Sequence, residues 1–364
     1  MKQEVIQGDV AEALVTIIER VSPKKIVWCT GRTSFKSSSV FPLFKELSSK
    51  FSIIHINDFQ VNPVFEDVLR IVDQHDLTEV DLLISIGGGS VMDFTKLLKY
   101  YHGEAKETML AKPVDNAKSL HRIRHLAIPT TAGSGSDATH FAVMYKDQEK
   151  QSIAHAELLP DYVILDPLLT LSKDKFLTAV TGMDAICQAL ESLWAIEGNE
   201  ISASAAEEAL KRLIPSFTSV VNTPNLTLRN EVLLGAHLAG RAINVSTTTG
   251  PHALAYYLTQ FHGIPHGEAV GLNIDFFLAI NWTFLSNELQ ERILSVFGVR
   301  NKDEVIDVLR NFKLDTGLKV SLKEVNSLDI DTYLSAINMD RMKNNPAQYD
   351  KETFKKLLLD YHQL

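Results

Sequence analysis

Four side chains near the middle of the chain have the types and the spacing of a site for a single metal ion. Asp184 and Gln188 are four residues apart, so on a helix they share one face. His252 and His266 lie further along the chain, and each directly follows a proline. A hard carboxylate with two imidazoles suits a divalent first-row metal such as zinc or iron(II). We therefore predict that Asp184, Gln188, His252 and His266 are the metal ligands.

Two glycine-rich loops upstream of these residues favour a nucleotide site. Residues 84–93 have the pattern of a strand, a turn containing Gly87, Gly88 and Gly89, and the start of a helix. Glycines let a backbone approach a pyrophosphate, and a helix N-terminus supplies free N–H groups. The turn lacks the G-x-G-x-x-G fingerprint, and a purely structural turn is the alternative. Residues 129–136 form a second loop of glycines and hydroxyls after another apolar strand. Two such loops in one sheet predict a nucleotide at its edge, and a metal beside a nucleotide suggests hydride transfer.

The composition is ordinary for a soluble globular protein and limits the possible partners. The chain has 364 residues, of which 45% are hydrophobic and 22% charged, enough for two domains. Its formal net charge of −9 argues against nucleic acid or an anionic membrane as the main partner. The N-terminus lacks the apolar segment of a secretory signal, and no stretch has the pattern of a membrane span. Cys29 and Cys187 both fall in apolar segments, so we expect buried thiols in a reducing cytoplasm.

Short apolar runs alternate with amphipathic segments in the first half of the chain. The runs predicted as strands are residues 26–30, 51–56, 81–86, 126–129 and 162–165. This alternation predicts a parallel sheet with helices on both faces. After Pro167 helical periodicity dominates, over residues 174–196, 201–221, 227–244, 252–262 and 268–285. We expect an α/β dinucleotide-binding domain over residues 1–167 and an all-helical metal and substrate domain over residues 168–364.

In its motifs and their order the chain resembles the group III, iron-containing alcohol dehydrogenases. The matching stretches are Gly87-Gly88-Gly89-Ser90 with Asp93 and Lys96, Pro129 to Ser134, Asp166-Pro167, Thr181 to Ala185, His252-Ala253 and Pro265-His266-Gly267. The resemblance covers nearly the whole chain. It implies a nucleotide domain and a helical metal domain, an architecture shared with dehydroquinate synthase, with a cleft between them. It also implies that Asp184, His252 and His266 bind the metal.

Two positions depart from the family's usual pattern. The fourth metal ligand is usually histidine and here is Gln188, whose neutral carbonyl oxygen is a poorer zinc ligand than imidazole. The alternative is that Gln188 only donates or accepts hydrogen bonds there while water completes the coordination. Four residues after the first metal histidine the family often has another histidine, where this chain has Tyr256. We expect Tyr256 or water to pass a proton to the alkoxide, His262 to line the site, and Glu191 to support the ligands without binding the metal.

The residues expected to bind the dinucleotide are Gly31, Arg32, Asn62, Gly87, Gly88, Gly89, Ser90, Asp93, Thr130, Thr131, Ser134 and Lys150. For Lys150 a solvated surface lysine is the alternative. After the first predicted strand, where NAD enzymes commonly carry an acid, the chain has Gly31 and Arg32, followed by Thr33 and Ser34. No carboxylate stands there to repel a 2′-phosphate, and Arg32 can bind one. We therefore expect NADP(H) to be preferred and NAD(H) to be possible.

One branch of the family, the phosphonoacetaldehyde reductases, is similar in further stretches. These are residues 139–143, 184–192, 240–244, 251–256 and 341–346. The resemblance implies reduction of phosphonoacetaldehyde to 2-hydroxyethylphosphonate. The candidates to meet its negative charge are His140, Arg241, Arg341 and Lys343, although an ordinary salt bridge is the alternative for Arg241.

Other functions remain open at this point. They are a general short-chain or sugar-derived alcohol dehydrogenase of the same family, a lyase of the dehydroquinate synthase type, and a homologue whose metal site has decayed. For the reductase, the expected metal is Fe²⁺ or Zn²⁺. We also expect a homo-oligomer, such as a dimer.

Overall fold

The computed structural model describes residues 3–32, 35–36, 38–111, 114–116, 118–120, 122–147 and 149–364. The chain divides into two compact units. One comprises Met1–Thr131 with Ser136–Ser172, and the other comprises Ala132–Gly135 with Lys173–Leu364. The short segment 132–135, which the sequence-based division assigns to the first domain, therefore groups with the helices. The expected hydroxyl contacts of Thr33 and Ser34 lie outside the described residues.

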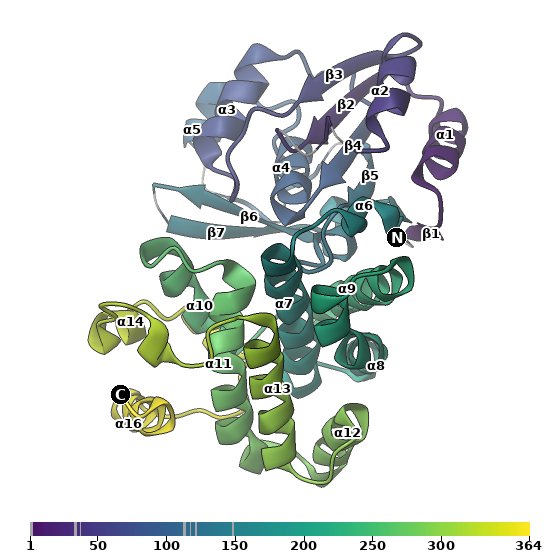
Figure 1. Ribbon diagram of the computed structural model, residues 1–364. Coiled ribbons are helices and arrows are strands. Elements are labelled where there is room, and N and C mark those ends of the chain that lie inside the picture. The colour runs from purple at the N-terminus through teal and green to yellow at the C-terminus, as the bar shows by residue number, and fades with distance from the viewer. Residues whose placement is uncertain are drawn as a thin grey trace. The chain divides into compact units, whose positions relative to one another are not determined.

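A six-stranded parallel sheet forms the centre of the first unit (Figure 1). Its spatial order is β1-β8-β5-β4-β2-β3. The strands are β1 (Glu4–Gln7), β2 (Lys25–Thr30), β3 (Ser52–Ile56), β4 (Leu82–Gly87), β5 (Arg124–Pro129) and β8 (Tyr162–Leu165). The five strands predicted from apolar runs are all confirmed. The edge strand β1 is only four residues long and was not predicted.

Helices on both faces bury the sheet, because alternate side chains of each strand enter opposite cores. Val27 of β2 lies in the core that contains helices α3 and α4, whereas Trp28 lies in the core that contains α1 and α2. The helices of this unit are α1 (Val10–Val21), α2 (Phe41–Ser48), α3 (Phe65–Gln74), α4 (Gly89–Tyr100), α5 (Lys106–Ala111) and α6 (Leu168–Leu171). Single 3₁₀ turns cover Ser136–Ala138 (η1) and Ala156–Leu158 (η2).

An antiparallel hairpin of β6 (Phe141–Lys146) and β7 (Glu149–Ala154) stands apart from the main sheet. The sequence reading did not predict it. Its second strand, Glu-Lys-Gln-Ser-Ile-Ala, lacks the alternation of apolar and polar residues that marks a half-buried strand. The hairpin nevertheless packs Ala142, Met144 and Ile153 into the core beside α4.

The second unit is a helical bundle, and no strand occurs among its described residues. Its helices are α7 (Lys175–Trp194), α8 (Glu200–Asn222), α9 (Leu226–Ser246), α10 (Gly250–Phe261), α11 (His266–Asn281), α12 (Asn287–Phe297), α13 (Lys302–Thr316), α14 (Ile330–Ser335), α15 (Met339–Lys343) and α16 (Lys351–His362). Single 3₁₀ turns cover Trp282–Phe284 (η3) and Leu322–Glu324 (η4). The predicted fold class, a parallel α/β domain followed by an all-α domain, is confirmed. Among the described residues, none of the helices combines the length and the apolar character needed to span a membrane.

Capping side chains and small residues set the positions of the central helices. The carboxylate of Asp174 accepts the backbone N–H of Leu177 at 2.8 Å and so starts α7. Gly267 in the first turn of α11 lets that helix touch α7, since a Cβ at Gly267 would lie 2.0 Å from the carbonyl oxygen of Val180. These two features bring the first turn of α11 against the middle of α7.

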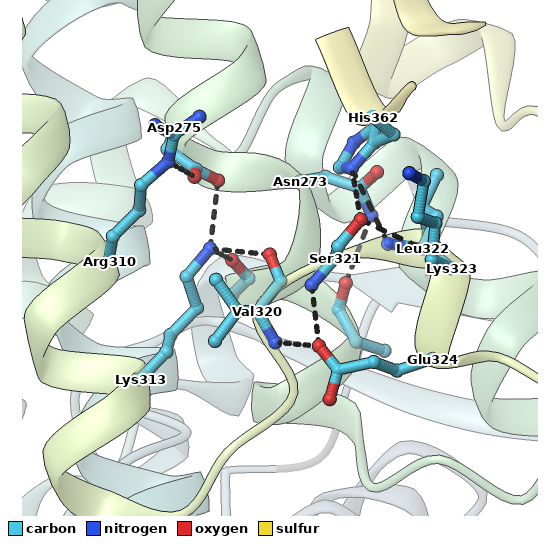
Figure 2. Close-up of polar contacts among 12 residues, drawn as sticks. Asn273, Asp275, Arg310, Lys313, Val320, Ser321, Leu322, Lys323, Glu324 and His362 are labelled. Atoms are coloured by element: carbon cyan, nitrogen blue, oxygen red, sulfur yellow. Dashed lines mark hydrogen bonds and ion pairs between the residues drawn. The ribbon is translucent and has the colours of Figure 1, made fainter. Parts of the chain in front are cut away.

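A buried ion pair joins α11 to α13 (Figure 2). Lys313 Nζ lies 2.9 Å from Asp275 Oδ1, and both side chains are at most 1% exposed. The same ammonium donates to the carbonyl oxygens of Gly271 and Val320, and Arg310 pairs with the other oxygen of Asp275 at 3.3 Å. Most of the remaining α11 surface is apolar and buried. The ion pair therefore gives a largely apolar helix one specific partner, α13. Specifying which elements pack together is a recognised role of buried polar contacts.

Candidate functional site

Three helices of the second unit bring the predicted metal ligands together. Asp184 and Gln188 lie one turn apart on α7, His252 lies in the first turn of α10, and His266 is the first residue of α11. The nearest donor atoms of Asp184, His252 and His266 all lie within 4.8 Å of one another. His252 Nε2 is 3.4 Å from Asp184 Oδ1. Two ligands bound tetrahedrally at about 2.1 Å from a metal would be roughly 3.4 Å apart, so this spacing fits a common ion.

Two oxygen atoms at the cluster are buried and accept no hydrogen bond from the described residues, although one of them, Asp184 Oδ1, lies 3.4 Å from His252 Nε2. Among the described residues neither Asp184 Oδ1 nor Gln188 Oε1 has a hydrogen-bond partner. Asp184 is 6% exposed and Gln188 is 3% exposed. Leaving buried acceptors unsatisfied is costly, and a bound cation removes that cost. The donor set of one carboxylate, one amide oxygen and two imidazoles fits a divalent transition metal.

Glu191, one turn beyond Gln188 on α7, holds the other side of the His252 ring. Its Oε2 lies 2.5 Å from His252 Nδ1. Its Oε1 accepts from the backbone N–H of Thr249 at 2.8 Å and from the Thr249 hydroxyl at 3.1 Å. Thr249 is the residue before α10, so the carboxylate also meets free N–H groups at the N-terminus of that helix. A fully buried acid thus sets both the start of α10 and the orientation of the His252 ring.

The electrostatics of the cluster favour a positive charge between the two carboxylates. Burial by itself lowers the pKa of His252, but Glu191 and Asp184 outweigh it and raise that pKa to about 10. Burial by itself raises the pKa of Asp184, yet contact with His252 and the nearby His266 hold it below its usual range. Both shifts have the same cause, which is strong stabilisation of a cation at this position. A metal ion held by Nε2 would take the place of that proton.

Tyr256 and His262, the two predicted catalytic side chains, have different neighbours. The Tyr256 ring stacks on the His266 ring with centroids 6.0 Å apart and an angle of 11° between the planes. His262, directly after α10, packs against Tyr257 with centroids 5.5 Å apart. Both Tyr256 and His262 are partly exposed. Tyr256 is therefore in ring contact with a predicted ligand, whereas His262 contacts the neighbouring aromatic side chain.

In the first unit the two predicted nucleotide loops are adjacent. Gly87 at the end of β4 pairs with Pro129 at the end of β5, and the backbone N–H of Thr130 donates to the Gly87 carbonyl at 2.9 Å. A Cβ at Gly88 would lie 3.0 Å from the Thr131 hydroxyl oxygen, so the loops touch where Gly88 has no side chain. The start of α4 there provides free N–H groups for a phosphate.

Asn62 and Ser90 also meet in this region. The backbone N–H of Asn62 donates to the Ser90 hydroxyl at 3.1 Å. Asn62 has a φ of +59°, in the left-handed region that asparagine tolerates better than most residues. The turn before α3 is thereby fixed against the first turn of α4.

Asp93 and Lys96, two further motif residues on α4, make buried contacts with the chain that follows β5. Asp93 accepts from the Ser136 hydroxyl at 2.6 Å and from the backbone N–H of Val143 at 3.1 Å. Lys96 is fully buried and donates to Ser136 and to the carbonyl oxygens of Thr139 and Phe141. Burial lowers the pKa of Lys96 to about 8 and raises the pKa of Asp93. Both side chains hold the second loop in place.

A carboxylate that the prediction of cofactor preference did not consider lies beside Arg32. Asp58 follows β3, and its Oδ1 is 2.5 Å from the guanidinium of Arg32. Arg70 on α3 approaches the same carboxylate at 3.4 Å. The sequence contained a signal for this pair, because Asp58 lies two residues after the predicted strand 51–56, and the parallel neighbours β2 and β3 end at the same edge of the sheet. Arg70 also pairs with Asp67 at 2.9 Å, so the charges of the two arginines and the two aspartates in this group balance.

The other predicted residues are spread over both units. In the first unit His140 packs against Phe141, and Lys150 lies in β7 opposite Tyr145. In the second unit Arg241 is exposed on α9 and Arg341 is half-buried on α15. Lys343 is 73% exposed and lies 3.7 Å from Asp340. Ser134 is exposed in the segment 132–135 that groups with the helices.

Comparison with known proteins identifies the family. A family model for iron-containing alcohol dehydrogenases matches residues 2–167. A second model, for the C-terminal part of the same family, matches residues 178–361. Long-chain-alcohol dehydrogenase 1 of Geobacillus thermodenitrificans is 27% identical over 85% of this chain and 82% of its own. Phosphonoacetaldehyde reductase of Streptomyces viridochromogenes is 26% identical over 80% of this chain and 79% of its own.

A solved structure agrees with this result. Sulfoacetaldehyde reductase from Bifidobacterium kashiwanohense, in complex with NAD⁺, is 26% identical and has a TM-score of 0.86. The match covers 99% of this chain and 96% of that one. The chain therefore belongs to the iron-containing alcohol dehydrogenase family, whose members are oxidoreductases acting on alcohols and aldehydes.

Proposed function

We propose that this protein is a metal-dependent aldehyde reductase that transfers hydride from NAD(P)H to an aldehyde bearing an anionic group, most specifically phosphonoacetaldehyde. The observation that carries the proposal is the gathering of Asp184, His252 and His266 beside the unpartnered oxygen of Gln188. These four residues would hold a divalent cation such as Fe²⁺ or Zn²⁺. When bound, that cation acts as a Lewis acid toward a carbonyl oxygen, and the nicotinamide supplies the hydride.

The protein's own residues set the geometry and handle the proton. Glu191 accepts from His252 Nδ1, which leaves Nε2 as the coordinating atom. Tyr256 stacks on His266, and its Oη is the proposed proton donor to the product alkoxide. His262, which packs on Tyr257, is proposed to line the site without contacting the metal. The buried carboxylates of Asp184 and Glu191 keep the local field suited to a cation.

For the dinucleotide we propose binding at the adjacent loops of the α/β unit. The turn at Gly87–Ser90 and the start of α4 would receive the pyrophosphate, with Thr130 and Thr131 beside them. Asn62, Ser134 and Lys150 are the remaining residues proposed to contact the dinucleotide. Asp93 supports the second loop through its hydrogen bond with Ser136. Gly31 and Arg32 would meet the adenosine ribose. We propose a preference for NADPH, because the chain has Gly31 and Arg32 where NAD enzymes commonly carry an acid, and Arg32, although paired with Asp58, could bind a 2′-phosphate.

The substrate proposal rests on two relatives that act on acetaldehydes carrying a strong acid group. A phosphonate in a protein that is acidic overall needs local cations. Arg241 is the first candidate, since it follows Gly240, whose Cα packs on Gly135 beside Gln188. Arg341 and Lys343 on α15 and His140 in the first unit are the others. The Asn344-Asn345 pair that follows them is buried and binds backbone groups of the same unit.

The substrate is tested by comparing kcat/KM for phosphonoacetaldehyde, sulfoacetaldehyde and propanal with the metal-loaded enzyme. We expect the phosphonate to be far the best substrate. Arg241→Ala or Arg341→Ala should lower its kcat/KM by the equivalent of roughly 2–5 kcal/mol and affect propanal much less. Arg300→Ala is the control. The Arg300 side chain, just before α13, is 90% exposed, and among the described residues its ion pair is with Glu304. Equal efficiency with propanal, or no loss for Arg241, Arg341 and Lys343 variants alike, would leave a general alcohol dehydrogenase of the family.

A cytoplasmic location and a homo-oligomeric state belong to the same proposal. Cys29 and Cys187 are both free and buried, which suits a reducing compartment. The oligomeric state is measured directly by light scattering of the purified enzyme, for which we expect a dimer and which a monomer would contradict.

A further inference from the structure

The loop that leads into His252 contains a residue in an unfavourable backbone conformation. Residues 247–249 connect α9 to α10, and His252 is the third residue of α10. Thr247 has a φ of 56° and a ψ of −174°. This region is essentially limited to glycine, and a β-branched residue there is a genuine outlier. Such a conformation persists only where the surrounding structure determines it.

Asn344, directly after α15, supplies that determination. Its amide nitrogen lies 2.7 Å from the carbonyl oxygen of Ser246, 2.9 Å from the Thr247 hydroxyl and 3.2 Å from the carbonyl oxygen of Thr248. An amide has two N–H groups, so one of them is shared between two acceptors. Asn344 is 4% exposed, and these bonds therefore form away from water. Ser246, Thr247 and Thr248 are thus all tied to one side chain.

The same asparagine is itself anchored on its other side. Its Oδ1 accepts the backbone N–H of Glu197 at 2.8 Å, and its backbone carbonyl accepts the N–H of Ile196 at 3.0 Å. Ile196 and Glu197 belong to the connection between α7 and α8. Asn344 therefore links the end of α7, the helix that carries Asp184 and Gln188, to the loop that precedes His252.

The far end of the loop is fixed by Glu191, as described above. Thr249 donates to Glu191 twice, and the indole N–H of Trp194 donates to the Thr249 hydroxyl at 2.9 Å. Just past His252, the backbone N–H of Asn338 donates to the carbonyl of Ala253 at 3.3 Å. The path of the chain from Ser246 to Ala253 is thus held by α7 on one side and by the segment around α15 on the other.

We propose that Asn344 is a positioning residue for the metal centre, one that holds the α9–α10 loop in the strained conformation that points His252 Nε2 toward Asp184. The inference rests on the proposed metal at Asp184, His252 and His266. Without the amide, Thr247 relaxes toward an ordinary φ, the first turn of α10 shifts, and the ligands lose their common centre. The neighbouring Asn344 and Asn345 then have separate roles within one short segment.

Asn345 provides a matched control for the loss of a buried amide. It is fully buried and exchanges two hydrogen bonds with Asn281, at 3.0 and 2.7 Å. Its amide also donates to the carbonyl of Ala347 at 3.1 Å. None of these partners lies in the α9–α10 loop. Asn345→Ala should therefore lower the melting temperature of the metal-free protein as much as Asn344→Ala does, without the effect on the metal.

The experiment measures the affinity of the metal-stripped full-length protein for Zn²⁺ alone, by competition with a chromophoric chelator, and its melting temperature. We expect Asn344→Ala to weaken Zn²⁺ binding by about tenfold or more, the range found when partners of metal ligands are lost. Asn344→Asp has the same shape but no amide donors, and it should show a comparable loss even if the alanine variant does not fold. Asn345→Ala should stay within about twofold of the unsubstituted protein, a difference of roughly 0.4 kcal/mol.

A second-site change tests the role of backbone strain. Glycine adopts the conformation of residue 247 without penalty. Thr247→Gly should therefore restore most of the Zn²⁺ affinity lost in Asn344→Ala. Three results would overturn the proposal: unchanged affinity in both Asn344 variants, an equal loss in Asn345→Ala, or no recovery in the double variant. Failure of the unsubstituted protein to bind Zn²⁺ would instead refute the metal site, and the role of Asn344 with it.

Discussion

The Nδ1 atom of His252 lies 2.5 Å from Oε2 of Glu191, while Nε2 of the same ring faces Asp184 Oδ1 at 3.4 Å. An ionised carboxylate only accepts hydrogen bonds, so Nδ1 must carry the hydrogen. Nε2 is then the atom whose lone pair is available to a metal. A carboxylate that orients a ligating histidine in this way also raises the basicity of the ligand.

Glu191→Gln should therefore weaken metal binding while leaving the helical unit folded. The amide has nearly the same shape, but it is neutral and supports the Nδ1–H tautomer less strongly. We expect Zn²⁺ affinity to fall by about 10- to 100-fold. Glu207→Gln serves as the control, because it removes a carboxylate of α8 that pairs with Arg292 of α12. Identical Zn²⁺ titrations for the Glu191 variant and the unsubstituted protein would show that this contact does not act on the metal.

Gln188→His should bind zinc more tightly than the natural residue. Imidazole is a better zinc ligand than an amide oxygen, and position 188 faces the cluster from the same side of α7 as Asp184. We expect a gain in Zn²⁺ affinity of at least about fivefold, or roughly 1 kcal/mol, with aldehyde reduction retained. Loss of metal in this variant would mean that Gln188 does not bind the ion directly.

The ion pair between Asp275 and Lys313 should respond asymmetrically to substitution (Figure 2). Asp275→Leu leaves the fully buried Lys313 ammonium facing only carbonyl oxygens, which should lower the free energy of unfolding by about 3–5 kcal/mol. Lys313→Met should cost less, because Asp275 keeps Arg310 as its partner. Combining both substitutions should recover much of the loss. Denaturant unfolding of the three variants measures this order, and a larger loss in Lys313→Met than in Asp275→Leu would contradict it.

Cofactor choice should depend on the balance of charge around Asp58. Arg32→Ala should reduce the preference for NADPH by the equivalent of about 1–3 kcal/mol, since a hydrogen bond between charged groups is lost. Asp58→Asn should increase the preference, because a carboxylate that competes for both arginines is removed. The ratio of kcat/KM for NADPH to that for NADH reports both effects. A better ratio for NADH in the unsubstituted enzyme would refute the preference itself.

Much of the fold was predictable because its signals are local. Apolar runs such as residues 81–86 mark buried parallel strands, and the helices after Pro167 show clear periodicity. The spacing of Asp184 and Gln188 places them on one helical face. The structure brings the two predicted histidine ligands, His252 and His266, close to Asp184. The strand pairing of β4 with β5 brought the two predicted loops together as expected.

What the sequence did not reveal depends on tertiary contacts. Strand β7 is polar and is recognisable only when paired with β6. The role of Asn344 depends on carbonyl groups almost a hundred residues away in the sequence. The positive φ of Thr247 is a backbone conformation that local preferences disfavour for a β-branched residue. Likewise the pairing of Arg32 with Asp58 arises because two parallel strands end side by side. No pattern within a short window encodes such contacts.

The measurement that tests the account most directly is metal-dependent hydride transfer by the unsubstituted protein and by His266→Ala. Each protein is stripped with a chelator, supplied with Fe²⁺ or Zn²⁺, and mixed with NADPH and phosphonoacetaldehyde while the loss of reduced nicotinamide is followed. We expect no turnover without metal, recovery on adding it to the unsubstituted protein, and no bound metal or activity in His266→Ala, although its α/β unit still binds NADPH. Full activity in a demonstrably metal-free His266→Ala protein would contradict the central claim.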